Sequence, residues 1–175
     1  MRVKILVAAF LTLALASYLV ARPAEGSDKS HFKATLSSYG EVPTNSTTGQ
    51  GDLDLRIDDS AKTITFTLTY SGLAAPAAAA HIHLGARSTN GGVSVFLCGG
   101  GGQALCSPGT SSEATATGTI TAANVIGPTT QGIAPGEFDE LVAAIRAGVT
   151  YANIHNSVFP GGEIRGQIND KNERD

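Results

Sequence analysis

The stretch DLDLRIDDSAKTITFTLTY, residues 52–70, contains the clearest secondary-structure signal in the chain. Leucine and isoleucine alternate with charged residues over 52–58, and apolar residues alternate with threonine over 63–70. Successive side chains of a β-strand point to opposite faces of a sheet, so each run has one apolar and one polar face. Asp58-Asp59-Ser60 forms a turn between them. The stretch therefore predicts an antiparallel hairpin with one buried face.

The remaining sequence predicts further short strands and one helix. Strands are expected over residues 32–36, 80–85, 93–97, 113–122, 149–155 and 163–168. The apolar residues within 138–145 follow helical spacing, with acidic residues in the first turn and Arg146 in the last. We expect this helix to cap an open end of the sheet. The charged tail, 169–175, is expected to be frayed.

The N-terminal residues have the pattern of a targeting segment. Arg2 and Lys4 precede an apolar run from Ile5 to Val20, which is typical of a secretory signal within residues 1–26. We expect this segment to be cleaved and the protein to be secreted, periplasmic or located in the cell envelope. The run also approaches the length of a membrane span, so the alternative is that it stays uncleaved as an anchor. We expect the protein to be attached to a membrane only in that case.

The composition favours one small β-domain. About 150 residues remain after the signal, which fits a single domain with its own core. The chain has no tryptophan, 15% charged residues and a net charge of -3, and it is rich in glycine. Because no basic stripe is present to neutralise phosphates, nucleic acid is excluded as an expected partner.

Two cysteines, Cys98 and Cys106, flank a glycine-rich segment of seven residues. In an exported chain, two cysteines so close together favour a disulfide that closes this loop. A role as metal ligands is the competing interpretation.

Three of the four histidines lie on predicted strands. His81 and His83 alternate in residues 80–85 and so share one face, and Asn153 and His155 share a face of the strand near residue 151. Three imidazoles aimed at one point would suit copper or zinc. Alternatively, they are hydrogen-bonded polar residues of a packed sheet. The spacing leaves both interpretations open.

Glu163 and Arg165 are two residues apart on the last predicted strand and are expected to share a face. Arg165 could hold a carboxylate ligand through its planar guanidinium. The preferred interpretation is an internal pair with Glu41 or Glu163 that fixes the meeting of the first and last strands. No Gly-x-Ser-x-Gly elbow is present, and a hydrolase would require His155 to pair with a serine.

Four motifs occur together in a characteristic order: Glu41-Val42-Pro43, residues 80–85, residues 151–155 and residues 160–168. With these motifs the chain resembles the CHRD domain, which is named for its repeats in chordin and also occurs alone in bacterial exported proteins. The resemblance covers residues 31–168. It implies an all-β, antiparallel Greek-key sandwich or barrel with one short helix. The growth-factor role of chordin should not be transferred, because that protein surrounds its repeats with cysteine-rich modules.

A looser likeness connects the histidine motifs to copper-zinc superoxide dismutases. His81, His83 and His155 could occupy comparable places on a barrel, but the second histidine cluster and the aspartate of the zinc site are missing. His31 is the remaining candidate for a fourth ligand. We therefore expect a non-enzymatic binding or structural module with a protein or carbohydrate partner and no certain cofactor. The alternative is a copper- or zinc-binding protein with redox activity.

Overall fold

The computed structural model describes residues 30–170, so the expected signal or anchor at 1–26 lies outside the described residues. Within that range the chain forms nine strands and one α-helix. The strands are β1 (His31–Ser37), β2 (Gln50–Asp58), β3 (Thr63–Ser71), β4 (Ala77–Leu84), β5 (Val93–Cys98), β6 (Ala114–Ile120), β7 (Thr150–Asn156), β8 (Ile164–Gln167) and β9 (Asn169–Asp170). The helix α1 spans Phe138–Arg146, and short 3-10 helices lie at Ser38–Gly40, Ala122–Asn124 and Thr129–Gln131.

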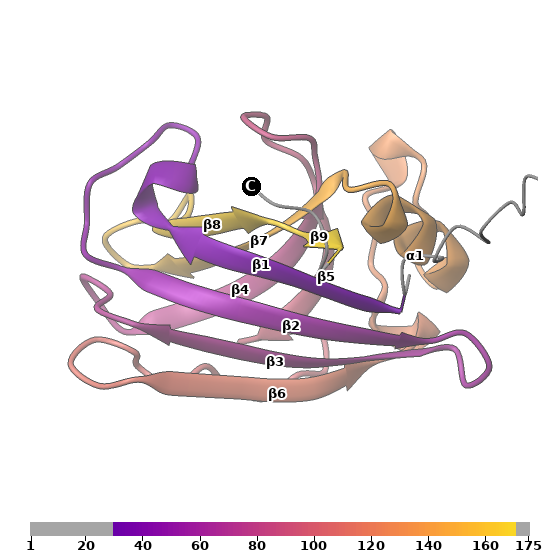
Figure 1. The fold of residues 1–175 in the computed structure, drawn as a ribbon, viewed down its shortest axis with the longest axis horizontal. Helices are drawn as coiled ribbons and strands as arrows, with labels where there is room; N and C mark the ends of the chain where they lie inside the picture. Colours follow the sequence, from indigo (N-terminus) through magenta and orange to yellow (C-terminus); the bar gives the residue numbers. More distant parts are fainter. Residues whose placement is uncertain (1–29, 171–175) are drawn as a thin grey trace, which may run out of the picture.

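All the strands belong to one antiparallel sheet. Their order is β5-β4-β7-β8-β1-β2-β3-β6, and β9 pairs with β1 beside β8. The sheet curls around the core into a nearly closed barrel (Figure 1). The all-β antiparallel architecture expected from the sequence is confirmed. No helix among the described residues is long and apolar enough to cross a membrane.

The predicted hairpin is formed by β2 and β3. Leu53 pairs with Leu68 and Leu55 pairs with Phe66, and these side chains are buried in the core. The threonines between them on β3 face outward, and Thr65 and Thr67 are exposed. The alternation of residue types therefore corresponds to the inner and outer faces of the barrel.

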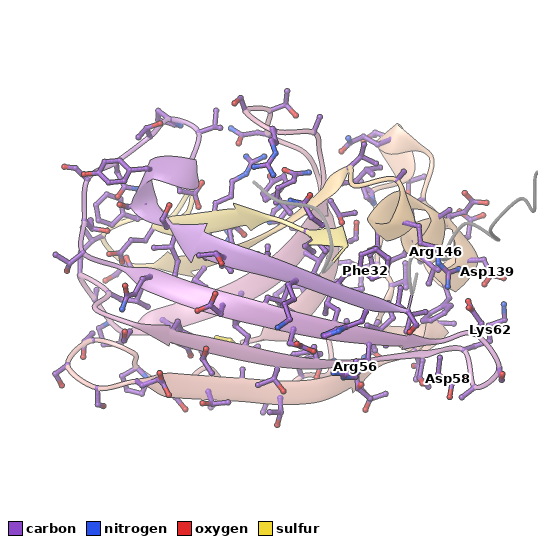
Figure 2. All side chains as sticks on the ribbon, viewed as in Figure 1. Phe32, Arg56, Asp58, Lys62, Asp139 and Arg146 are labelled. Atoms are coloured by element: carbon purple, nitrogen blue, oxygen red, sulfur yellow. A yellow bond between two sulfur atoms is a disulfide. The ribbon has the colours of Figure 1, made fainter. Side chains whose placement is uncertain are left out.

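Helix α1 lies at one end of the barrel, as Figure 1 shows. Its four predicted apolar residues are all buried: Phe138, Leu141, Val142 and Ile145. Lys62 Nζ lies 2.7 Å from Asp139 Oδ1, and Arg146 Nη2 donates to Asp59 Oδ2 at 2.7 Å. These ion pairs connect the helix to the turn between β2 and β3. Figure 2 labels Lys62 of the turn and Asp139 and Arg146 of the helix.

The end of the domain differs from the expectation of a frayed tail. Asn169 and Asp170 form β9, which pairs with Lys33 and Phe32 of β1. The preceding residue, Ile168, is completely buried, so the chain is held against the barrel at this point. The prediction of fraying is therefore wrong for residues 169 and 170, and the rest of the tail lies outside the described residues.

Candidate metal centre

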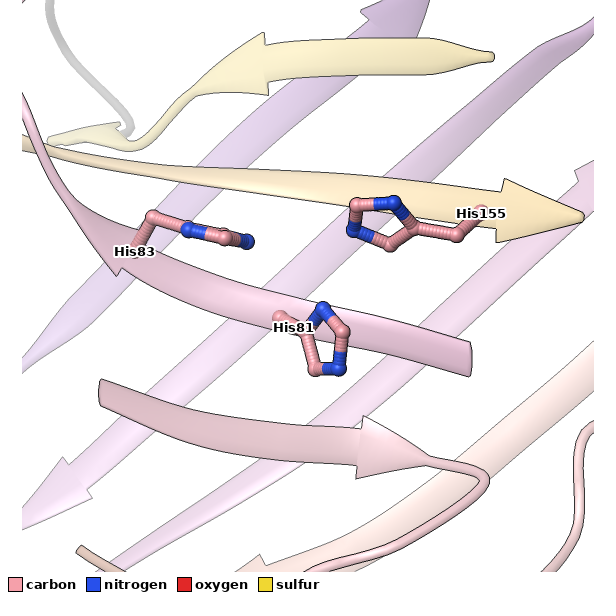
Figure 3. Close-up of side chains that lie close together, drawn as sticks. All are labelled: His81, His83 and His155. Atoms are coloured by element: carbon pink, nitrogen blue, oxygen red, sulfur yellow. The ribbon is translucent and has the colours of Figure 1, made fainter. Parts of the chain in front are cut away.

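The centre is built on two neighbouring strands, β4 and β7. His81 stands opposite Asn153, and His83 stands opposite Tyr151. The alternate residues of both strands, among them Ile82 and Ile154, point into the core. The outer face thus receives His81 and His83 from β4 and His155 from β7, which we call the histidine cluster (Figure 3).

The histidine cluster is compact enough to surround one ion. One nitrogen of each ring can be chosen so that all three lie within 4.8 Å of one another. Three such atoms share a point no more than about 3 Å from each, and an inward movement of about 1 Å would give the roughly 2.0 Å of a metal–nitrogen bond. A nitrogen of each ring faces the space between the side chains in Figure 3.

Backbone carbonyls orient two of the rings. His83 Nδ1 lies 2.9 Å from the carbonyl oxygen of Gly91, and His155 Nδ1 lies 3.0 Å from that of Pro160. In a neutral imidazole with one N–H, the Gly91 contact places the proton of His83 on Nδ1 and leaves the lone pair on Nε2. His155 has the same arrangement in the tautomer that donates to Pro160. Carbonyl acceptors behind a histidine are the usual outer partners of metal ligands, because they fix both the tautomer and the ring orientation.

Two nitrogens of the cluster are buried without a hydrogen-bond partner: His81 Nδ1 and His83 Nε2. Leaving a buried polar atom unpaired costs about 1–3 kcal/mol, so native structures rarely do so without a reason. His83 Nε2 has the lone pair that a metal ion requires, and His81 Nδ1 has it in the tautomer with the proton on Nε2.

Burial keeps the histidines in the ligand form. It lowers the pKa of His81 to about 3, and the neighbouring His155 and His83 add to this effect. Burial also lowers the pKa of His83 and of His155. The uncharged imidazole, which is the form that binds a metal, is therefore favoured at neutral pH.

The cystine loop packs beside the histidine cluster. Cys98 and Cys106 are joined by a disulfide, as the sequence suggested. Phe96 meets His81 edge to face, with ring centroids 4.3 Å apart. A Cβ added to Gly100 would lie 2.6 Å from the Phe96 ring, so the loop lies directly on that ring. Glycine is required for this close approach.

Tyr151 and Arg165 lie on the side of the histidine cluster opposite the cystine loop. The rings of His83 and Tyr151 are stacked with centroids 4.8 Å apart, and the Arg165 guanidinium carbon lies 3.4 Å from the centroid of Tyr151. Because β7 lies between β4 and β8, Tyr151 separates the histidine from the arginine. Arg165 Nη2 also donates to the carbonyl oxygens of Ala86 and Thr89. Arg165 thereby holds the loop that follows β4.

Glu41 and Glu163 occupy different environments. Burial raises the pKa of Glu41, and the Val42 amide, the charge of Arg165 and the Asn153 side chain partly offset this rise. Glu163 precedes β8 rather than lying on it, and its carboxylate accepts hydrogen bonds from the Ala74 amide and from Asn156. Arg165 therefore interacts electrostatically with Glu41, one of the two partners considered from the sequence.

His31, the candidate fourth ligand, lies elsewhere. It is on β1, and its Nε2 is 2.7 Å from Asp54 Oδ2. Sequence reasoning also overlooked Tyr151, although its position two residues before Asn153 places it on the same face. The carbonyls of Gly91 and Pro160 belong to loops, and no sequence signal could have identified them.

A polar cavity of about 650 Å³ lies next to this region. Tyr39, Arg87, Glu41 and Arg165 are among its lining residues. Since Glu41 also interacts with Asn153, the cavity adjoins the outer partners of the histidine cluster.

Comparisons with curated proteins and with solved structures gave no match. A family model described as the CHRD domain matches residues 32–168, a range that includes the histidine cluster, the disulfide and α1. This match covers most of the sequence and agrees with the motifs quoted above. The chain therefore belongs to the CHRD-domain family.

Proposed function

We propose that this CHRD domain is a non-enzymatic binding module that holds one copper or zinc ion through His81, His83 and His155. The observation that carries the proposal is the pair of buried nitrogens without partners, His81 Nδ1 and His83 Nε2, inside a group of three imidazoles. A bound ion would satisfy both atoms.

The donor set favours these metals. Neutral imidazole is a good ligand for copper and for zinc, and three protein ligands leave one position of a tetrahedral site to be filled. His81 and His83 are 9% and 7% exposed, which suits retention of an ion more than rapid exchange of substrates. Copper bound here could also exchange electrons, so a redox role is the alternative to simple metal binding.

An oxidising compartment fits this function. The disulfide between Cys98 and Cys106 supports a secreted, periplasmic or cell-envelope location, where such bonds persist. The proposed N-terminal signal would deliver the chain there by cleavage, or would retain it at the membrane as an anchor.

The test is metal titration of the purified protein, with copper and zinc added separately to metal-free samples. The unmodified protein should bind one equivalent, and a variant with His81→Ala, His83→Ala and His155→Ala should lose at least about 100-fold in affinity. His31→Ala is the matched control, because it removes the remaining histidine on β1 and should bind normally. Equal binding by the unmodified protein and the triple variant would contradict the proposal.

A second candidate function rests on the polar cavity. Its volume, about 650 Å³, and its lining of Tyr39, Arg87 and Glu41 suit a polar ligand such as a carbohydrate or a protein loop. Failure of metal binding would make this the leading function, and binding screens with Tyr39→Ala as the comparison variant would then test it.

A further inference from the structure

Asn153 lies on the same face of the sheet as the histidine cluster and contacts His155. It stands opposite His81 on the same outer face, is 3% exposed, and its Oδ1 lies 2.9 Å from His155 Nε2. Its side chain is also near enough to His83 to influence the pKa of that ring, although His83 Nε2 has no partner in good hydrogen-bond geometry. The amide is therefore placed between two of the three imidazoles.

The contact between Asn153 and His155 brings two acceptors together. Each nitrogen of the His155 ring faces an oxygen acceptor, and a neutral ring has only one N–H. With that proton on Nδ1 and donated to the carbonyl of Pro160, the ring presents a lone pair at Nε2. Asn153 Oδ1 also presents lone pairs. Two lone pairs 2.9 Å apart repel each other unless a cation or a proton lies close to both.

Turning the Asn153 amide over would not remove the conflict. Asn153 Nδ2 and Glu41 Oε1 both lie beside Gly162, and the Asn153 side chain lowers the pKa of Glu41, as an N–H donor near a carboxylate does. After a flip, the amide oxygen would face that carboxylate instead. Gly162 keeps these groups close together, because a Cβ there would overlap Glu41 Oε1 and lie 2.9 Å from Asn153 Nδ2. The neighbouring Glu41 carboxylate therefore favours the orientation in which the amide oxygen points to the cluster.

We propose that Asn153 Oδ1 is the fourth ligand of the metal held by His81, His83 and His155. This inference rests on the proposed function. Ligands that share one tetrahedral ion through bonds of about 2.0–2.2 Å lie about 3.3–3.6 Å apart. Asn153 Oδ1 and His155 Nε2, which are 2.9 Å apart, would need to separate by about 0.5 Å to admit the ion. The ion would lie between the facing lone pairs and relieve their repulsion, giving a closed site with three nitrogens and one oxygen.

The test compares Asn153→Ala with Asn156→Ala, using zinc affinity and the visible spectrum of bound Co²⁺. Asn156 is a matched control because it lies on the same strand, is 2% exposed, and contacts Glu163 instead of the histidines. Asn153→Ala should weaken zinc binding about 10- to 100-fold and change the Co²⁺ spectrum. Asn156→Ala should lower stability and weaken zinc binding less than Asn153→Ala does, because Asn156 supports the turn before Pro160 but supplies no ligand. It should leave the Co²⁺ spectrum unchanged.

The results separate the two proposals. Normal affinity and an unchanged Co²⁺ spectrum in Asn153→Ala would overturn the fourth ligand and leave the three-histidine site intact. Absence of zinc and Co²⁺ binding in the unmodified protein would overturn both. If Asn153→Ala does not fold, NMR of the unmodified protein decides: a shift of the Asn153 side-chain amide nitrogen on zinc addition supports coordination through Oδ1, and an unchanged resonance excludes it.

Discussion

The β2–β3 hairpin and the β4–β7 pair are both antiparallel, yet their outer faces differ in exposure to solvent. On β3 the outward threonines are partly or fully exposed to solvent. On β7 every residue from Thr150 to Ile154 is buried, including outward-facing Tyr151 and Asn153. The cystine loop and the loops containing Gly91 and Pro160 contact this second outer face.

This difference shows where function can be sought in a β-barrel of this kind. Solvent satisfies polar groups on an exposed face, so their identity matters little. A covered polar face must satisfy its groups internally, and nitrogens without partners are then informative. In this domain such nitrogens occur in the histidine cluster.

Replacing one arginine on each face should give the largest difference in stability. Arg165→Ala should destabilise the protein by about 2–4 kcal/mol, because it removes the contact with Tyr151 and the hydrogen bonds to Ala86 and Thr89, and leaves Glu41 without its nearby positive charge. Urea denaturation would measure this loss.

Arg56→Ala provides the control from the exposed face. The Arg56 side chain is 66% exposed, and its Nε lies 3.8 Å from Asp54 Oδ1, so the change should cost less than about 1 kcal/mol. Similar losses for the two arginines would contradict the distinction between the faces.

A smaller effect is expected from the adjacent glycines before β8. Gly162 has a φ of +126°, and an added Cβ would overlap Glu41, so Gly162→Ala should cost about 1–3 kcal/mol. Gly161 has no atom within 4 Å of an added Cβ, so Gly161→Ala should change stability by less than about 1 kcal/mol. Thermal unfolding of both variants would test the pair, and equal melting temperatures would refute the steric argument.

The smallest effect is a pH dependence of the metal-free protein. The folded-state pKa of His81 is about 3, below the ordinary value of 6.5, so protons bind the unfolded chain first as the pH falls. Stability should be complete above pH 6.5 and should decrease below it by about 1 kcal/mol per pH unit for this residue.

Denaturation curves with a chelator between about pH 7.5 and 5.5 would measure this slope. His81→Gln removes the titrating group and should reduce the slope. The same slope in both proteins would show that His81 does not contribute to it.

Residue patterns predicted most of the fold. The alternation in residues 52–70 located β2 and β3 within two residues, and the spacing of Phe138, Leu141 and Ile145 located α1. These features are local, so a short window of sequence contains them. The pairing of β9 with β1 was missed, because the polar residues Asn169 and Asp170 give no local strand signal.

The histidine cluster was predicted only in part. Period-two alternation placed His81 and His83 on one face and His155 on a second strand, and the likeness to superoxide dismutases suggested that the three meet. The adjacency of β4 and β7 and the ring orientations depend on tertiary structure. The lone-pair contact between Asn153 and His155 depends on side-chain rotamers, which no spacing rule can supply.

The pairing of Ser37 with Arg165 makes the first and last parts of the domain neighbours in the sheet. Folding slows as contacts join residues further apart in sequence, so completing this barrel should be a late event. A growing chain that has produced β4 without β7 has an unpaired strand edge beside its histidines, and such edges promote aggregation. The histidine cluster can therefore form only after nearly the whole domain has been synthesised.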